Sequence, residues 1–483
     1  MNSNKESQVT SPTSSEGNKF IYFLARPGKP TVKPPKKEKS NGDGAKSFDA
    51  TPMEFINDSF QETEFQLFST KKPSPKLLKY RKLERHEIIR AALECGYGPK
   101  SWWTSKLMME TDEVSELNKF LLARLEFAIS CIKQGNNKSW MVHPFYKQVE
   151  GSDKNPVSFI LGGIGSFFAA ENWLGEDDKM TSFLHKSIYG KAIVKIESTS
   201  SKSPDYLVEA GSKSWHLFES KGGCIGQRGN RLVQGLGQLD GTFVVGWHNG
   251  AKAVPKSCVC VHTRVDPKMS LDVMVIDPPA DDVAEEATPQ NSLVLIESVC
   301  KLLLVLRTID QFRCLAGVTE HAGVDGEWLY VETNNFGGLM VGIPYAYLIH
   351  ERELRSRMAL YLAADECANG FDGANDSFEF RFQKEIAPYR VKATQDLRDG
   401  YLAGSADLDS LSRDIVTAFR DRVDDFRISC AEILDLNSVL EAIWPNTEAR
   451  ALGRLGDDFG SASTFTSGGM LIRVIERPVN QEG

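Results

Sequence analysis

Residues 204–221 read PDYLVEAGSKSWHLFESK, and this stretch constrains the fold more than any other part of the chain. Two strand-like segments are joined by Gly-Ser-Lys-Ser, which is typical of a hairpin turn. Glu219 and Lys221 are two apart in the second segment, and side chains two apart on a strand share one face of the sheet. If Asp205 opens the neighbouring strand, its carboxylate reaches the same point. The sequence therefore predicts a hairpin that presents two carboxylates and one ammonium group together.

These side chains suit the binding of a divalent cation. Carboxylate oxygens are ligands for hard cations such as Mg²⁺, which keep bound waters available for chemistry. A nearby lysine can orient or deprotonate a metal-bound water, or neutralise charge on a phosphate. We therefore expect Mg²⁺, or Mn²⁺ in its place, at Asp205 and Glu219, with Lys221 beside it. The alternative for Glu219 and Lys221 is a surface ion pair of little energetic weight.

Pro204-Asp205 and Glu219-Ser220-Lys221, followed by a glycine pair, resemble the motif of the PD-(D/E)XK superfamily of metal-dependent nucleases. The resemblance covers roughly residues 155–280. It implies a restriction-endonuclease-like fold: a helix, a β-meander that carries the acidic residues, a second helix and a further strand. It also implies that Asp205 and Glu219 hold the metal and that the backbone carbonyl of Ser220 adds a further oxygen. Lys221 would position the attacking water.

The predicted helices on either side of the hairpin carry three lesser candidates. Upstream, residues 162–175 are expected to form a short helix, and the resemblance puts Glu171 forward as a third metal ligand or a contact to a metal-bound water. Downstream, a helix over 229–239 would place Gln234 and Gln238 on one face. Family members often have a glutamine here that points at the metal or the phosphate, and one branch has Gln-x-x-x-Tyr where this chain has Gln-x-x-x-Gln. The alternatives are a helix-surface glutamate and a solvated helix face.

Strands are also expected around the hairpin, at 191–199, 242–248 and 257–265. The order of helix, hairpin, helix and strands agrees with the family core. The predicted fold class is α/β, with a restriction-endonuclease-like mixed-sheet core, a helical N-terminal region and an α+β C-terminal domain.

Composition along the chain predicts four regions. The first is rich in Ser, Lys, Pro, Gly and Asn and is expected to be disordered, with apolar islands that could dock a partner protein. The second opens with seven basic residues and one acidic residue over 71–86, which either contact phosphate or form a solvated helix face. The C-terminal region, of unknown role, is a second place for a protein partner. The regions are a disordered segment at 1–70, a helical region at 71–150, a nuclease-like domain at 151–280 and an α+β domain at 291–483.

Overall composition narrows the classes of protein. The net charge of −8 provides no global basic field, so contacts to DNA must come from local patches. The nine cysteines are scattered without the paired spacing of a zinc site and are expected to be reduced thiols. The N-terminus does not resemble a signal peptide. The apolar stretch 292–312 carries charged residues and predicts a buried helix instead of a membrane span. A cytoplasmic protein without membrane contact is expected.

The favoured function is a Mg²⁺-dependent nuclease that hydrolyses phosphodiester bonds in DNA. By analogy with the family, it would be the effector of a bacterial restriction or antiphage-defence system. The alternative is a catalytically inactive nuclease-fold scaffold or specificity subunit that binds DNA or a partner protein. The presence of all three residues Asp205, Glu219 and Lys221 argues against that alternative. A third hypothesis is a regulatory protein unrelated to nucleases.

Overall fold

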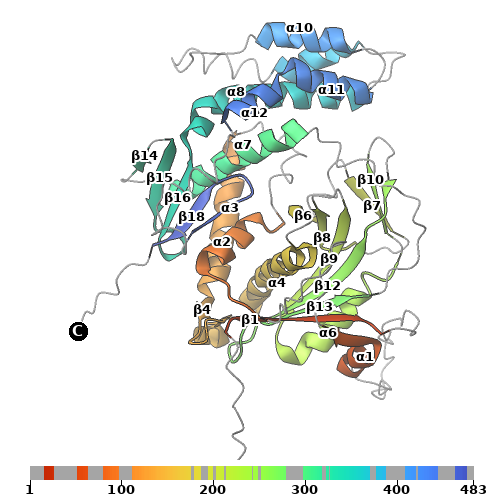
Figure 1. Ribbon diagram of the computed structural model, residues 1–483, viewed down its shortest axis with the longest axis vertical. Helices are drawn as coiled ribbons and strands as arrows, with labels where there is room; N and C mark the ends of the chain where they lie inside the picture. Colours follow the sequence, from red (N-terminus) through yellow and green to blue (C-terminus); the bar gives the residue numbers. More distant parts are fainter. Residues whose placement is uncertain are drawn as a thin grey trace, which may run out of the picture.

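A mixed α/β arrangement surrounds a central mixed sheet of eight strands (Figure 1). In the computed structural model, the described residues are 16–26, 52–63, 80–96, 111–175, 179–186, 194–198, 203–210, 214–241, 243–247, 252–278, 297–317, 322–325, 327–369, 377–387, 408–419, 423–443 and 463–475. The central sheet contains, in spatial order, β2 (Phe60–Thr63), β1 (Asn18–Ala25), β13 (Val273–Asp277), β12 (Ser257–Arg264), β9 (Trp215–Gly223), β8 (Tyr206–Ala210) and β6 (Met180–His185), with β3 (Tyr80–Arg81) also paired to β1. β12 runs parallel to β9 and β1 parallel to β13, whereas the other neighbours are antiparallel.

The predicted hairpin is confirmed as β8 and β9, which are antiparallel neighbours. The strand expected at 191–199 does not join them. It forms β7 (Val194–Ser198), which pairs with β10 (Phe243–Trp247) in a separate sheet completed by β11 (Lys252–Ala253). The second neighbour of β8, on the side away from β9, is instead β6, which was not identified in the sequence. Strand propensity marks a segment as extended but does not select its partner, which is decided by tertiary packing.

Two helices cover the two faces of the sheet at the hairpin. α4 (Gly151–Leu174) packs on β9 and β12 from one side, and α6 (Arg228–Leu236) packs on the same two strands from the other. α4 is longer than the helix predicted at 162–175, whereas α6 agrees closely with the helix predicted at 229–239. Among the described residues, α4 is the helix long and apolar enough to cross a membrane, and 83% of that apolar window is buried inside the molecule. Its apolar character is that of a core helix.

α4 approaches β9 closely because glycines face each other across the contact. A Cβ atom on Gly222 of β9 would overlap the backbone carbonyl oxygen of Ser158 in α4. From the helix side, a Cβ on Gly162 would lie 3.2 Å from the backbone nitrogen of Gly222 and from Ser220 Oγ. The Gly-Gly that follows Glu-Ser-Lys thus has a packing role that the motif alone did not reveal.

The expectation of disorder throughout residues 1–70 is wrong for two stretches. Residues 18–25 form β1, which pairs with β13 and buries Phe20 and Tyr22 in the core shared with α4. Residues 52–63 form α1 (Pro52–Ser59) and β2, and α1 packs on α6. These apolar islands are short, and the polar residues around them dominate the composition. The edge of β13 supplies backbone partners for β1, and α4 and α6 supply much of the apolar surface that orders the two stretches.

The region at 71–150 was expected to be helical, and the structure shows that it is helical only in part. It contains α2 (Arg85–Glu94) and α3 (Thr111–Ser130), followed by the short hairpin of β4 (Ile132–Gln134) and β5 (Trp140–Val142) and the 3-10 helix η3 (Pro144–Gln148). Residues 71–79 of the basic stretch lie outside the described part. Within the remainder, Arg81 binds Glu87 and Glu171, and Arg85 donates to the Phe336 carbonyl. These two arginines are therefore engaged within the protein.

The C-terminal region is α+β, as predicted. The buried helix expected at 292–312 is α7 (Glu297–Ala316). A five-stranded sheet follows, together with α8 (Tyr345–Asn369). The elements of this region are the strands β14 (Ala322–Asp325), β15 (Trp328–Thr333), β16 (Leu339–Pro344), β17 (Ser463–Phe465) and β18 (Leu471–Val474), the 3-10 helix η5 (Asn335–Gly337), and the helices α10 (Leu408–Ala418), α11 (Val423–Ile433) and α12 (Leu436–Ile443).

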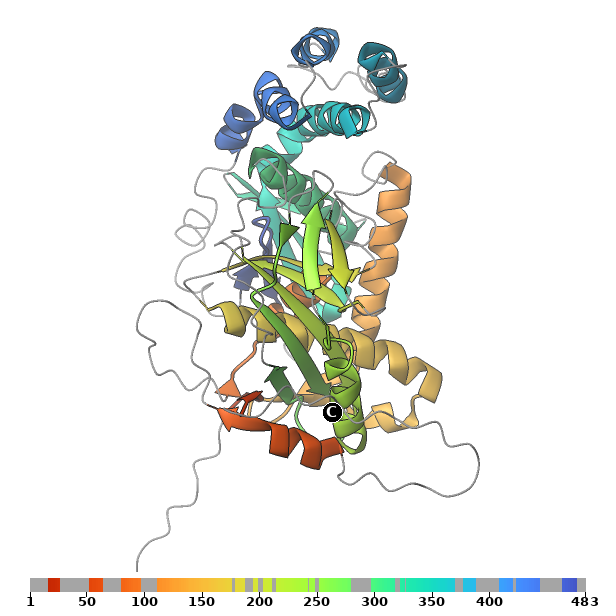
Figure 2. The ribbon, with the colours of Figure 1, turned by 90° about the vertical axis from the view of Figure 1, so that its right-hand side faces the viewer.

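The hydrophobic cores join the C-terminal region to the rest of the chain. One core cluster combines α2, α3 and α4 with residues of α7, β16 and β18. A second combines Leu207 and Leu217 of the hairpin with α7, α8 and the helices α10–α12. Those last helices lie at one end of the molecule, away from β1 and α1 at the other (Figures 1 and 2). The central sheet is thus packed against a C-terminal region that shares its core.

Replacement of Phe20 by alanine tests whether β1 is part of the fold. Phe20 is 1% exposed, so we expect Phe20→Ala to lower the free energy of unfolding by about 3–5 kcal/mol, because a buried ring is lost and a cavity remains. Chemical denaturation measures the change. Phe120→Ala is the matched control, since Phe120 is 62% exposed, and it should change stability by about 0.5 kcal/mol or less. Equal stabilities of the two variants would contradict the assignment of β1 to the core.

Gly222→Ala tests the close approach of α4 to β9. The added methyl group would collide with backbone atoms of Ser158, which cannot rotate away, so we expect a loss of about 1–3 kcal/mol or more. Gly226→Ala is the control, because a Cβ atom there would meet no other atom within 4 Å. Thermal unfolding of both variants gives the comparison, and a Gly222→Ala protein as stable as Gly226→Ala would contradict this packing.

Candidate functional site

Asp205 and Glu219 lie opposite each other at the end of the hairpin. Tyr206 pairs with Phe218 in the β8–β9 ladder, so Asp205, one residue earlier, faces Glu219, one residue later. The Asp205 amide donates to Glu219 Oε2 at 3.1 Å, and the Ser220 amide donates to Asp205 Oδ2 at 3.2 Å. Each carboxylate is thus oriented by the backbone of the opposite strand. The convergence predicted from the sequence is present.

Two lysines contact this carboxylate pair. Lys221 Nζ binds Glu219 Oε1 and lies 3.8 Å from Asp205 Oδ2. Lys186, directly after β6, places its Nζ 3.2 Å from Asp205 Oδ1, and its amide donates to the Asp205 carbonyl at 2.8 Å. Lys186 was not a candidate in the sequence, because β6 had not been identified as the neighbour of β8. No local pattern around it distinguishes it from the many surface lysines.

Burial makes Glu219 an unusual carboxyl group. Its side chain is fully buried, and burial together with the charge of Asp205 raises its pKa to about 7. Lys221 opposes the shift but does not cancel it. A cation bound beside such a group favours the charged carboxylate and therefore lowers its pKa. A pair of carboxylates can hold a metal ion for this reason.

Asp205 and Glu219 are the side chains that could hold a divalent cation of the Mg²⁺ type at this place. Within the described ranges, no group of three or more His, Cys, Asp or Glu side chains is arranged to hold a metal. Asp205 and Glu219 would be the two side-chain ligands, with water or substrate oxygens as the others, which is usual for Mg²⁺. The Ser220 side chain points to the α4 face, towards Gly162, and its amide binds Asp205. That the Ser220 backbone carbonyl adds a further oxygen ligand to the metal stays a prediction.

Glu171 is not brought to this site. It lies near the C-terminal end of α4, where Arg90 binds it at 2.7 Å and Arg81 at 3.3 Å. The part of α4 that touches β9 is around Gly162, nine residues earlier, which corresponds to about 13 Å along a helix. Glu171 thus joins α4 to α2 and β3, and its proposed contact with the metal is not supported. α4 begins eleven residues, about three turns, before the predicted start at 162. The sequence could not separate these roles, because the partners of Glu171 come from α2 and β3, whose packing on α4 is set at long range.

Neither Gln234 nor Gln238 is the residue at which α6 comes closest to Glu219 and Lys221. Gly235 is the position of α6 that faces the two residues, since a Cβ there would lie 3.4 Å from Glu219 Cγ and 3.6 Å from Lys221 Cγ. Gln234, the preceding residue, is exposed, and Gln238 follows the end of the helix and is half-buried. The solvated-face alternative therefore describes Gln234. A role for Gln238 stays a prediction.

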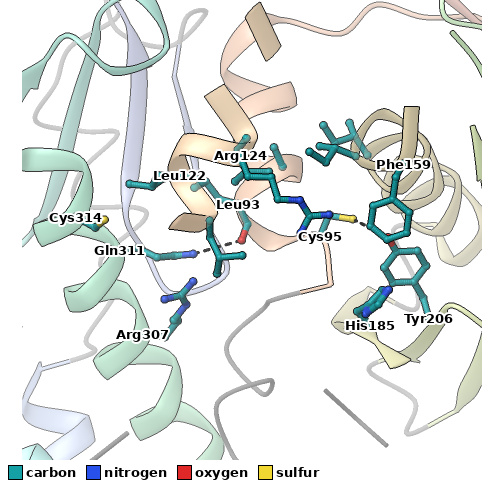
Figure 3. A pocket seen from close by; sticks show the side chains of 15 residues that line it. Leu93, Cys95, Leu122, Arg124, Phe159, His185, Tyr206, Arg307, Gln311 and Cys314 are labelled. Atoms are coloured by element: carbon teal, nitrogen blue, oxygen red, sulfur yellow. Dashed lines mark hydrogen bonds between the residues drawn. The ribbon is translucent and has the colours of Figure 1, made fainter. Parts of the chain in front are cut away.

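A pocket lies beside β6 and β8 (Figure 3). It is bounded by α2, α3, α4 and α7 together with the paired residues His185 and Tyr206, and its wall is mainly apolar. Arg124 and Arg307 supply the charged groups, and burial lowers the pKa of His185 to about 4. Asp205, Glu219 and Lys221 do not line this pocket, so it is distinct from the candidate site.

The raised pKa of Glu219 predicts a change of stability with pH. Between about pH 4.5 and 7 the folded protein keeps a proton that the unfolded chain has released, so raising the pH destabilises the fold at this residue. Glu219→Gln removes the titration, and its stability relative to wild type should rise from pH 5 to pH 8. Denaturant unfolding at both pH values measures the difference. Glu197→Gln, at a half-exposed carboxylate on β7, is the control, and an equal response of both variants would contradict the shift.

Comparison with known proteins gives no assignment: no protein-family model, curated protein or solved structure matches the chain. The function must therefore be argued from the geometry and chemistry of the site itself.

Proposed function

We propose that the protein is a Mg²⁺-dependent nuclease that hydrolyses phosphodiester bonds, with DNA as its substrate. The observation that carries the proposal is the convergence of Asp205, Glu219 and Lys221 at the end of one hairpin, with Glu219 fully buried and its pKa raised to about 7. Strongly perturbed carboxylates beside a specific charge partner are found preferentially at functional sites.

The surrounding fold supports the same proposal. Within the central sheet and its covering helices, the chain supplies α4, then the antiparallel strands β6, β8 and β9, then α6, then β12 parallel to β9. The intervening strands β7, β10 and β11 belong to a separate sheet. The order within the central sheet is the one implied by the resemblance to the PD-(D/E)XK nucleases, whose acidic residues lie on the meander. Two strands of that meander carry Asp205 and Glu219.

The roles of the residues follow from their contacts. Asp205 and Glu219 would hold Mg²⁺, which supplies a Lewis acid that neutralises charge on the phosphate. Lys221 now binds both carboxylates. With Mg²⁺ held by the carboxylates, the Lys221 ammonium would be available to donate to a phosphate oxygen or to orient the attacking water. Lys186, on the opposite side of Asp205, holds that carboxylate in place.

The second candidate is a nuclease-fold protein that binds DNA or a partner without cutting. One observation favours it: Glu171 is held by Arg81 and Arg90, so the site has two carboxylates without the third that the resemblance implied. The role of effector in a bacterial restriction or antiphage system, and a cytoplasmic location, belong to the nuclease proposal and rest on analogy.

A cleavage assay separates the two. The full chain is incubated with plasmid, linear and single-stranded DNA and with RNA, in Mg²⁺, Mn²⁺ or EDTA. We expect metal-dependent cutting of DNA, and a loss of at least about a hundredfold in Lys221→Ala. Lys252→Ala is the matched control, because Lys252 is an exposed lysine paired to Glu197 outside the central sheet.

Three outcomes are informative. Cutting lost in Lys221→Ala and kept in Lys252→Ala supports the nuclease. Cutting that is equal in wild type and Lys221→Ala contradicts the assigned site. Binding of DNA without cutting in any metal supports the scaffold.

A further inference from the structure

His262 lies beside Lys221 on the same face of the sheet. The two residues are register partners in the parallel β9–β12 pair, where neighbouring strands are about 4.8 Å apart. Both face α6, because Cys260, two residues before His262, contacts Leu232 of that helix. His262 is completely buried, and Arg228, the first residue of α6, is 6% exposed. Buried groups of this kind next to a reaction centre require an account of their hydrogen bonds.

The contact between these two side chains determines which nitrogen of His262 carries the proton. Arg228 Nε donates to His262 Nδ1 at 3.3 Å. A guanidinium can only donate, so Nδ1 must accept and the hydrogen of the neutral ring is on Nε2. The ring is neutral, because burial and the charge of Arg228 lower the pKa of His262 to about 3, against a hydrogen bond to its own backbone that raises the pKa. His262 Nε2 is therefore a hydrogen-bond donor.

Two buried donors on these neighbouring residues are consequently left over. Neither His262 Nε2 nor Arg228 Nη2 has a hydrogen-bond partner within the part of the chain that the structure describes. The free side of Nε2 faces the end of β9, where a Cβ on Gly223 would lie 3.9 Å from Nε2 and from Gln227 Oε1. Glycine at 223 leaves that space without a side chain. A buried donor without an acceptor is costly, and an oxygen atom from outside the chain would remove the cost.

The charge around this space selects an anion. Arg228, Arg231 and Arg264 all act on His262, whereas Asp272 is the carboxylate that pairs with Arg264, at 2.5 Å. The guanidinium groups thus outnumber the compensating carboxylate. α6 also begins at Arg228 without a side-chain cap on its first amides, which adds positive potential at the same end.

We propose that His262 Nε2 and Arg228 Nη2 form a subsite for a phosphate oxygen, next to Lys221. This inference rests on the proposed function for its substrate: the anion is a backbone phosphate of the nucleic acid, either the one that is cleaved or its neighbour. Lys221 lies between the subsite and the carboxylates, so one phosphate bound here is adjacent to both the ammonium and the metal ligands. The subsite orients substrate and has no part in proton transfer.

Phosphate binding by the wild-type protein tests the subsite without any need for cleavage. The ring nitrogen and proton resonances of His262 are recorded by NMR while inorganic phosphate is added, with chloride at equal ionic strength as the control. We expect a saturable shift of the Nε2–H resonance with phosphate and none with chloride. No shift with phosphate would overturn the inference, and this holds even if variants at the site fail to fold.

Substitutions test the same subsite with DNA. The dissociation constant of a short duplex is measured in EDTA, and KM and kcat in Mg²⁺, for His262→Leu, Arg228→Met and the conservative His262→Gln. Loss of one hydrogen bond to a charged group should raise the dissociation constant and KM about tenfold or more, with a smaller effect on kcat, and glutamine should restore part of the affinity. Lys268→Met, which removes one exposed positive charge, is the matched control.

The subsite and the nuclease proposal can fail separately. Phosphate binding at His262 without cutting in any metal supports the subsite and contradicts the nuclease. Cutting that depends on Lys221, with KM and affinity in His262→Leu and Arg228→Met equal to those of Lys268→Met, supports the nuclease and overturns the subsite.

Discussion

The parallel pairing of β9 with β12, enclosed between α4 and α6, is the constraint on which the site depends. It aligns Glu219 with Cys260 and Lys221 with His262, so the acidic and the cationic groups occupy successive positions of one face. The opposite face of β9 packs against α4, whose close approach requires glycine at 222. A register shift of one residue would move Glu219 and Lys221 to the α4 face and bury both against apolar side chains.

Charge burial is the second feature that organises the region. Glu219 is completely buried, and its hydrogen bonds to the Asp205 amide and to Lys221 offset part of the cost of removing a carboxylate from water. Burial still raises its pKa to about 7, so the fold holds this group in an unfavourable state. His262 on the neighbouring strand β12 and Arg228 on α6 show the reverse condition, with donors that lack acceptors within the described residues. A cation at the first place and a phosphate at the second would relieve both, which links the two proposals physically.

The hairpin and the face it presents could be predicted because they depend on local rules: alternation along a strand and turn residues between two strands. Other features could not be predicted locally. The short apolar stretch at 18–25 becomes a core strand only because the edge of β13 is available. Glu171 could be placed on a helix, but whether that position faced the metal or Arg90 depended on where α4 begins and on its contact with α2. Lys186 and His262 became neighbours of the motif through strands whose pairing is set at long range.

The sequence by itself determined that Asp205, Glu219 and Lys221 lie together, since a period of two and a hairpin turn suffice to align them. It also determined the order of the helices and most of the strands around them. The tertiary structure alone decided the remainder: that β6 borders β8, that Glu171 is an internal ion-pair partner, and that Arg228 and His262 come into contact with two of their buried donor atoms left without acceptors in the described part of the chain. The reason is physical. Side-chain direction along a strand is a local property, whereas burial, strand partners and hydrogen-bond satisfaction depend on which distant segments pack together.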